Sequence, residues 1–223
     1  MFGKEMKLMS LYGFNIKIDA SWIFLLFLVV WTLSAGYFPY MVEGLNPLSY
    51  LWMGLLGAVG LFASLIFHEL SHAIVARKWG LPIRGITLFI FGGVAEMESE
   101  PKTAKIEFWM AIAGPIASVV LGVMFLGLEH MGAVFQWPLL ITAVVGYLWK
   151  INFILAAFNM LPGFPLDGGR ILRSILWAWK KDIRWATHQA VRSGSFIGTV
   201  LIILGILGFL TGNFIGGLWW FLF

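Results

Sequence analysis

The chain contains no cysteine, and few of its residues carry a charge. The missing cysteine excludes disulfide bridges, zinc sites built from thiolates and a cysteine nucleophile. Charged residues make up 12% of the 223 residues, whereas a soluble domain carries roughly a quarter. Hydrophobic residues make up 60%, and the mean hydropathy is +0.89. Because so little charge cannot keep a folded surface in water, we expect an integral membrane protein.

Six apolar runs are candidates for helices that cross the bilayer, since a spanning helix needs about 20 mostly apolar residues. They cover residues 20–40, 50–76, 108–128, 138–161, 195–210 and 214–223. The first run follows basic residues, as in a signal peptide, but it lacks a convincing cleavage site, so we expect it to be retained. The last run reaches across only about half a bilayer, which favours a cut within a helix and a missing C-terminal cytosolic extension. The expected fold is one all-α transmembrane domain over residues 1–223.

The basic residues predict how this domain is oriented. Fourteen of the 15 Lys and Arg fall on one side of the arrangement, and only Lys150 lies within a span. The loops on the other side, residues 41–49, 129–137 and 211–213, contain none. Since basic loops stay in the cytoplasm, we expect a multi-pass protein of the cell membrane with both termini cytoplasmic. The net charge of +4 follows from this asymmetry and indicates no nucleic-acid partner.

The second run contains His68-Glu69-Leu70-Ser71-His72, an H-E-x-x-H sequence. Residues four apart share a face of a helix, so both imidazoles can bind one metal ion, with Glu69 beside it as general base and acid. The alternative is that each histidine is a hydrogen-bonded core residue. Ionisable side chains in a membrane helix cost at least ~2–3 kcal/mol each at mid-bilayer and are kept for binding, so the metal site is favoured. Glu69 precedes Arg77 by eight residues, which puts it about 12 Å below the cytosolic interface.

A catalytic zinc ion normally has three protein ligands, so a third is expected. Asp167 is the candidate, because it follows a helix break at Pro162 and Pro165. Broken backbone at membrane depth is tolerated only where it is buried in protein or lines a wet cavity. The alternative role for Asp167 is that of N-cap to a helix that begins near Ile171.

Other polar residues lie close to this break. Residues 170–179 form an amphipathic segment, which we expect along the cytosolic interface with Arg170 and Arg173 as ordinary anchors. Asn152 and Asn159 share a face of the fourth span. We expect Asn152 to join helices, whereas Asn159 either joins helices or donates to substrate near the metal.

Residues 84–98 contain two β-prone runs around Gly92 and Gly93, which predict a small hairpin or sheet between the second and third spans. This segment is either a structural connector or an exposed strand edge near the metal. A helical substrate must be extended before its backbone can be cut, and pairing with a strand edge replaces the hydrogen bonds that unwinding breaks.

Together these motifs resemble the site-2 protease family of intramembrane zinc metalloproteases. The resemblance rests on residues 68–72, 91–95, 113–115 and 158–170, which follow the family's order and cover most of the chain. It implies one zinc ion per chain, bound by His68, His72 and Asp167, with Glu69 as the catalytic glutamate. It also implies that Asn159 lies in the active site. A strand near the metal is implied to hold the substrate, through Phe91, Gly92, Gly93, Val94 and Ala95.

The function implied is zinc-dependent cleavage of transmembrane segments within the bilayer, so the expected partners are single-span membrane proteins and lipid. Family members often act after a first cut outside the membrane and release a cytosolic regulator. A metal-ion transporter is one alternative, although the polar residues cluster in the cytosolic half and leave no polar path to the other face. A peptidase of soluble peptides at the membrane surface is another. No feature of the sequence indicates an oligomeric state or a particular substrate.

Overall fold

A computed structural model of the chain describes residues 6–19, 21–89, 92–97 and 100–222. Five helices of this described part are long and apolar enough to cross a membrane. The first, Ser21–Met41, is continuous through α1 (Ser21–Thr32), a π-helical turn η1 (Leu33–Tyr37) and α2 (Phe38–Met41). The others are α3 (Pro47–Lys78), α4 (Ala104–Val134), α5 (Leu139–Asn159) and α7 (Ile183–Leu210).

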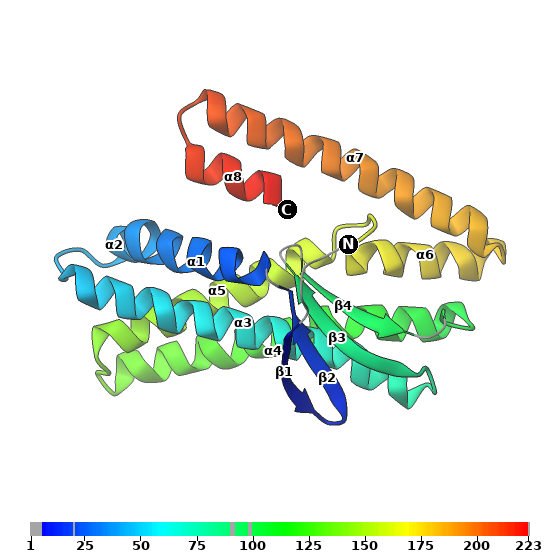
Figure 1. Cartoon of the computed structure of the whole chain (residues 1–223), viewed down its shortest axis with the longest axis horizontal. Helices are drawn as coiled ribbons and strands as arrows, with labels where there is room; N and C mark the ends of the chain where they lie inside the picture. Colours follow the sequence, from blue (N-terminus) through cyan, green and yellow to red (C-terminus); the bar gives the residue numbers. More distant parts are fainter. Residues whose placement is uncertain (1–5, 20, 90–91, 98–99, 223) are drawn as a thin grey trace.

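Two shorter helices follow the expected breaks in the chain. The first, α6 (Asp167–Lys180), joins α5 to α7, and the second, α8 (Phe214–Leu222), follows α7. The expected sixth span corresponds to α8, which is nine residues long and packs against α7 (Figure 1). The mostly helical fold is therefore confirmed, with five helices of membrane-spanning length, and a sixth crossing stays a prediction.

Side chains cap three of the long helices. Asn46 accepts from the Ser49 amide at the start of α3. Thr103 and Asp182 do the same for α4 and α7, since their side-chain oxygens bond the free amides of the first turn. The cap at Asp182 makes α7 begin well before residue 195, where the apolar run of the sequence starts.

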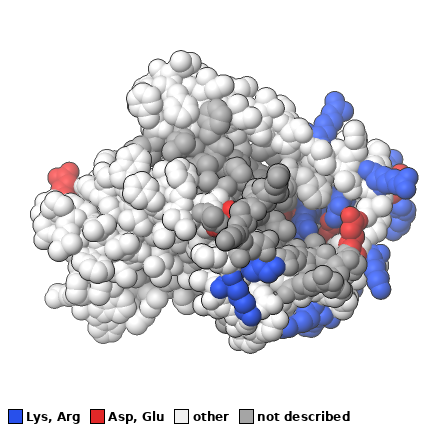
Figure 2. Space-filling view, viewed as in Figure 1, with Lys and Arg blue, Asp and Glu red and all other residues white. Residues whose placement is uncertain are grey.

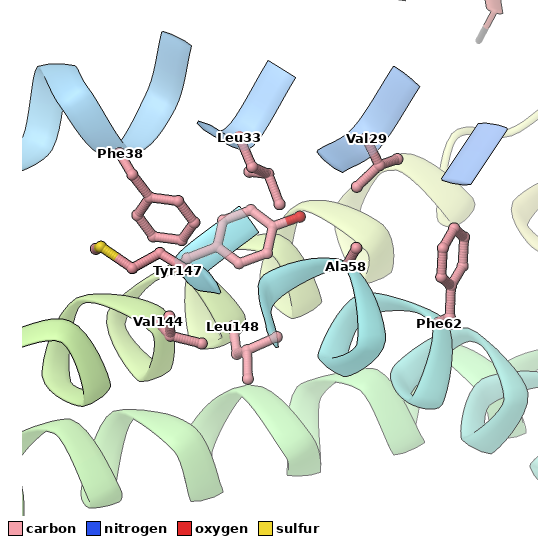
Figure 3. Close-up of a cluster of buried hydrophobic side chains, with 9 residues drawn as sticks. Val29, Leu33, Phe38, Ala58, Phe62, Val144, Tyr147 and Leu148 are labelled. Atoms are coloured by element: carbon pink, nitrogen blue, oxygen red, sulfur yellow. The ribbon is translucent and has the colours of Figure 1, made fainter. Parts of the chain in front are cut away.

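An apolar core holds the first span, α3 and α5 together (Figure 3). Phe38 and Tyr147 meet edge to face with ring centroids 5.9 Å apart, an arrangement that aromatic pairs prefer. Their neighbours in the core are Val29, Leu33, Met53, Ala58, Phe62, Val144 and Leu148. This core uses the part of α3 before His68, so the H-E-x-x-H turns lie beyond it.

A four-stranded sheet lies beside those last turns of α3. The strands are β1 (Met6–Leu11), β2 (Phe14–Ile18), β3 (Ile83–Phe89) and β4 (Gly92–Met97), in the order β1-β2-β3-β4. The antiparallel β3–β4 pair is the predicted hairpin between the second and third spans. The pair β1–β2 was not predicted, and β2 joins the hairpin by pairing in parallel with β3.

Strand β2 attaches the sheet to α3. Phe14 and Ile16 are buried against Leu70 and Ala73, which lie on the turns that also contain His68 and His72. The guanidinium of Arg77 donates to the carbonyl oxygen of Tyr12, 2.6 Å away, at the β1–β2 turn. The sheet is therefore held at the depth of the H-E-x-x-H residues.

Charged side chains are distributed unevenly along the bundle. On the face shown in Figure 2, the Lys and Arg side chains gather toward the end of the molecule that carries α6 in Figure 1. The opposite end of that face shows no basic side chain. This is the one-sided distribution of basic residues that the sequence predicted.

Candidate metal centre

His68 and His72 lie one turn apart on α3, and both are buried. Their rings are nearly perpendicular, with centroids 4.9 Å apart. The Nε2 atoms of His68 and His72 lie 3.0 Å and 3.1 Å from the same carboxylate oxygen, Oδ2 of Asp167. One donor atom from each of the three residues lies within 4.8 Å of the others, which is a group able to hold a metal ion.

Asp167 reaches the histidines from the first residue of α6. The N-cap of that helix is Leu166, so the alternative role of Asp167 as a cap is wrong. Gly168 and Gly169 follow, and a Cβ on either would lie 2.3 Å from backbone atoms of residues 160–163. Only glycine permits this approach, which folds the chain after α5 back onto the start of α6 and brings Asp167 to α3.

The opposite nitrogens of the two imidazoles bond to α4. Nδ1 of His68 lies 2.8 Å from Oγ of Ser118, and Nδ1 of His72 donates to the carbonyl oxygen of Met110, 2.7 Å away. A carbonyl can only accept, so Nδ1 of His72 carries the proton. With the Nδ1 proton fixed in this way, His72 turns Nε2 toward Asp167, and Nε2 is the atom that would bind a metal ion when the imidazole is neutral.

Gly114 of α4 leaves space beside the Nε2 atoms of His68 and His72. A Cβ at this position would lie 2.2 Å from Nε2 of His72 and 2.5 Å from Nε2 of His68. These distances are far below van der Waals contact, so a side chain here would press on both imidazoles at the nitrogens that face Asp167. Two imidazoles and a carboxylate form a donor set of known catalytic zinc sites, and the residues present therefore fit zinc.

The carboxyl group of Asp167 is charged in this setting. Burial acts to raise its pKa, but the facing imidazoles of His72 and His68 outweigh burial and lower the pKa of Asp167 below its ordinary value. Asp167 is therefore ionised at neutral pH, as a carboxylate ligand must be.

The other predicted site residues make fewer contacts that bear on their predicted roles. Glu69 is partly exposed and lies close enough to His68, His72 and Asp167 to interact electrostatically with each. Asn159 is the last residue of α5, and its side-chain amide donates to the carbonyl oxygen of Leu155, 3.0 Å away. Within β4 lie Gly92, Gly93, Val94 and Ala95, while Phe91 lies outside the described residues.

Asn152 joins helices, as predicted. Its amide donates to Oγ of Ser64 on α3, 3.0 Å away, and the asparagine is fully buried.

The expectation that Arg173 is an interfacial anchor is wrong. Arg173 is buried, and its Nε donates to Oε1 of Glu107 on α4, 2.6 Å away. Glu107 lies in the first turn of α4 and is completely buried. Sequence reasoning also passed over Ser118, whose only signal is a hydroxyl in an apolar helix one turn after Gly114.

Spanning-length helices around buried histidines and a carboxylate define a class, the multi-pass membrane zinc metallopeptidases. The chain belongs to peptidase family M50, whose model matches residues 56–136 and 129–205. It is 40% identical over 216 residues to Rip3 of Mycobacterium tuberculosis, covering 95% of this chain and 55% of Rip3. It is 34% identical over 207 residues to the zinc metalloprotease MJ0392 of Methanocaldococcus jannaschii, covering 91% of this chain and 54% of MJ0392. The chain thus spans about half the length of these relatives.

A solved structure shares this fold. The site-2 protease from Methanocaldococcus jannaschii matches with a TM-score of 0.66 at 29% identity, over 98% of this chain and 92% of that chain. The resemblance to the site-2 protease family, drawn from short motifs, is confirmed by these matches.

Proposed function

We propose that the protein is a zinc-dependent endopeptidase that cleaves transmembrane segments of other membrane proteins within the bilayer. The observation that carries the proposal is the convergence of His68, His72 and Asp167, whose donor atoms lie within 4.8 Å of one another inside a bundle of spanning helices. A bound zinc ion would act as a Lewis acid on water and on the scissile carbonyl.

Glu69 is the proposed general base and acid. It lies next to His68 on α3 and close enough to the three candidate ligands to interact electrostatically with each. In this role the carboxylate takes a proton from the attacking water and delivers it to the leaving amide nitrogen. His68, His72 and Asp167 hold the ion, while Ser118 and Met110 keep the two imidazoles oriented.

Strand β4 is the proposed site of substrate pairing. It is an edge strand in the described sheet, and β2 of the same sheet packs on the α3 turns that contain His72. An extended substrate that paired with β4 would recover the hydrogen bonds lost when its helix unwinds. Asn159 is proposed to donate to this substrate once its bond to Leu155 is exchanged.

The proposed orientation puts both termini and the water entrance in the cytoplasm. Basic residues flank the ends of α3 and α6, beginning with Arg77 and Lys78 just after the H-E-x-x-H turns. Since such residues stay on the cytoplasmic side, water would reach Glu69 from there.

The proposal is tested with purified protein and candidate single-span substrates, with and without a chelator, and with mass spectrometry of the products. We expect a cut within the transmembrane segment that the chelator abolishes and added zinc restores. Asp167→Asn should weaken zinc retention during dialysis. Cleavage of soluble peptides alone would indicate a surface peptidase instead. Zinc flux in proteoliposomes without any cleavage would indicate a transporter.

A further inference from the structure

A buried ion pair links α4 to α6 outside the candidate metal centre. Glu107 has no exposed surface, and Arg173 is 8% exposed. Nε of Arg173 donates to Oε1 of Glu107, and Nη2 of Arg173 forms an ion pair with the same oxygen. The other oxygen, Oε2, has no hydrogen-bond partner among the described residues. A buried pair of this kind is weak evidence for stability, because its desolvation offsets its attraction. It can instead specify how two elements are placed.

The two partners lie close in sequence to atoms of the metal centre. Glu107 precedes Met110 by three residues on α4, and the Met110 carbonyl orients His72. Arg173 follows Asp167 by six residues on α6. The pair therefore connects the segment that orients one candidate ligand to the helix that supplies another.

The start of α6 needs an external restraint. Gly168 and Gly169 fill its first turn, and glycine in a helix gives up the most backbone freedom of any residue. Because glycine has no side chain, neither position can make a side-chain contact that fixes the orientation of Asp167. The guanidinium of Arg173 also lies 5.1 Å from the ring centroid of Phe164, so it contacts the loop that leads into Asp167. One side chain thus fixes both the helix and the loop before it.

We propose that Glu107 and Arg173 act as a positioning clamp, which holds Asp167 at the distance from His68 and His72 that a metal ion requires. This inference rests on the proposed metal centre. Among the described residues, neither Glu107 nor Arg173 forms a hydrogen bond or ion pair with His68, His72 or Asp167. Both would therefore act through the helices α4 and α6 that contain them.

The test compares Glu107→Gln with Glu129→Gln in the purified full chain. Both glutamates lie on α4, and Glu129 accepts a hydrogen bond from Nε1 of Trp149 on α5 at 2.7 Å, away from the metal centre. We measure zinc affinity by chelator competition, the visible spectrum of the cobalt-substituted protein and the thermal midpoint. Glu107→Gln should weaken zinc binding about 10- to 100-fold, as loss of a supporting contact does, and should change the cobalt bands. Glu129→Gln should leave both unchanged, whatever its effect on the midpoint.

Two further variants keep the test decisive if Glu107→Gln does not fold. Arg173→Lys retains the charge but loses the paired nitrogens, and it should weaken zinc binding with a smaller loss of stability. In the double variant Glu107→Gln/Arg173→Gln no charge is left unpaired, and zinc affinity should recover part of the loss seen in Glu107→Gln. Unchanged zinc affinity and an unchanged cobalt spectrum in folded Glu107→Gln or Arg173→Lys would overturn the clamp. Failure of the unsubstituted protein to bind zinc would overturn the metal centre itself.

Discussion

Gly114 lies where a methyl group would interfere with the candidate metal centre. A Cβ at this position would lie 2.2 Å from Nε2 of His72 and 2.5 Å from Nε2 of His68, well inside van der Waals contact. We therefore expect Gly114→Ala to fold but to retain no zinc after dialysis. The matched control is Gly127→Ala on the same helix, since a Cβ there meets nothing within 4 Å. Zinc content by mass spectrometry of metals separates the two, and full zinc retention by Gly114→Ala would contradict this geometry.

Glu69 is the proposed proton carrier and not a proposed ligand, so its replacement should affect cleavage and leave metal binding intact. Replacing it by glutamine keeps the shape and removes the basic oxygen. Glu69→Gln should bind zinc with the stoichiometry of the unsubstituted protein and lose at least about 100-fold in cleavage rate, the lower end of the effect of general acid–base catalysis. The measurement is single-turnover cleavage of a single-span substrate. Undiminished turnover by this variant would rule out Glu69 as the base.

Some of these side chains could be assigned to the site from the sequence and others could not, for a physical reason. The spacing of His68 and His72 is local, so helical geometry alone predicts that they share a face. Asp167 is remote in sequence, and it could be predicted only from the helix break before it. The bond from His72 to the Met110 carbonyl leaves no trace in residue type, because every residue has a carbonyl. Arg173 was misinterpreted because its partner Glu107 is 66 residues away, and an amphipathic helix does not reveal which element covers its polar face.

Helix α7 holds the loop between α5 and α6 through close backbone contact. The amide of Phe164 donates to the carbonyl oxygen of Ala190, and a Cβ at Gly194 would lie 2.0 Å from the carbonyl oxygen of Phe164. Gly194→Ala must therefore push α7 away from this loop, at a cost of about 1–3 kcal/mol for overpacking. In contrast, Gly198→Ala places its methyl group in open space and should be neutral or slightly stabilising, since alanine favours helix. Thermal unfolding in detergent should give a lower midpoint for Gly194→Ala than for Gly198→Ala, and equal midpoints would contradict the packing.

The helices of the fold were easier to predict than the sheet. Long apolar runs predict spanning helices directly, and all five described spans overlap predicted ones. The hairpin of β3 and β4 was predicted because its strands are adjacent in sequence. The strands β1 and β2 were missed, because β2 pairs in parallel with residues 85–88, far along the chain. Such long-range pairing is decided by burial of Phe14 and Ile16 on α3, which no local pattern reports.

Across the bundle, the charge distribution and the location of the candidate metal centre together predict the side of the membrane from which water reaches that centre. The basic residues gather toward the end that carries α6, whose first residue is Asp167. If that end is cytoplasmic, water and metal reach the centre from the cytoplasm. The opposite orientation would put the same centre within reach of the other side of the membrane.

Because the chain contains no cysteine, single introduced cysteines can report this orientation without background. Glu43 lies in the loop between α2 and α3, and Lys102 lies just before α4 near the sheet; both are exposed. With the expected orientation, a membrane-impermeant maleimide added to intact cells should label Glu43→Cys and leave Lys102→Cys unlabelled. Permeabilising the cells should make Lys102→Cys reactive, which also controls for its exposure. Labelling of Lys102→Cys in intact cells would reverse the orientation and, with it, the side from which the centre draws water.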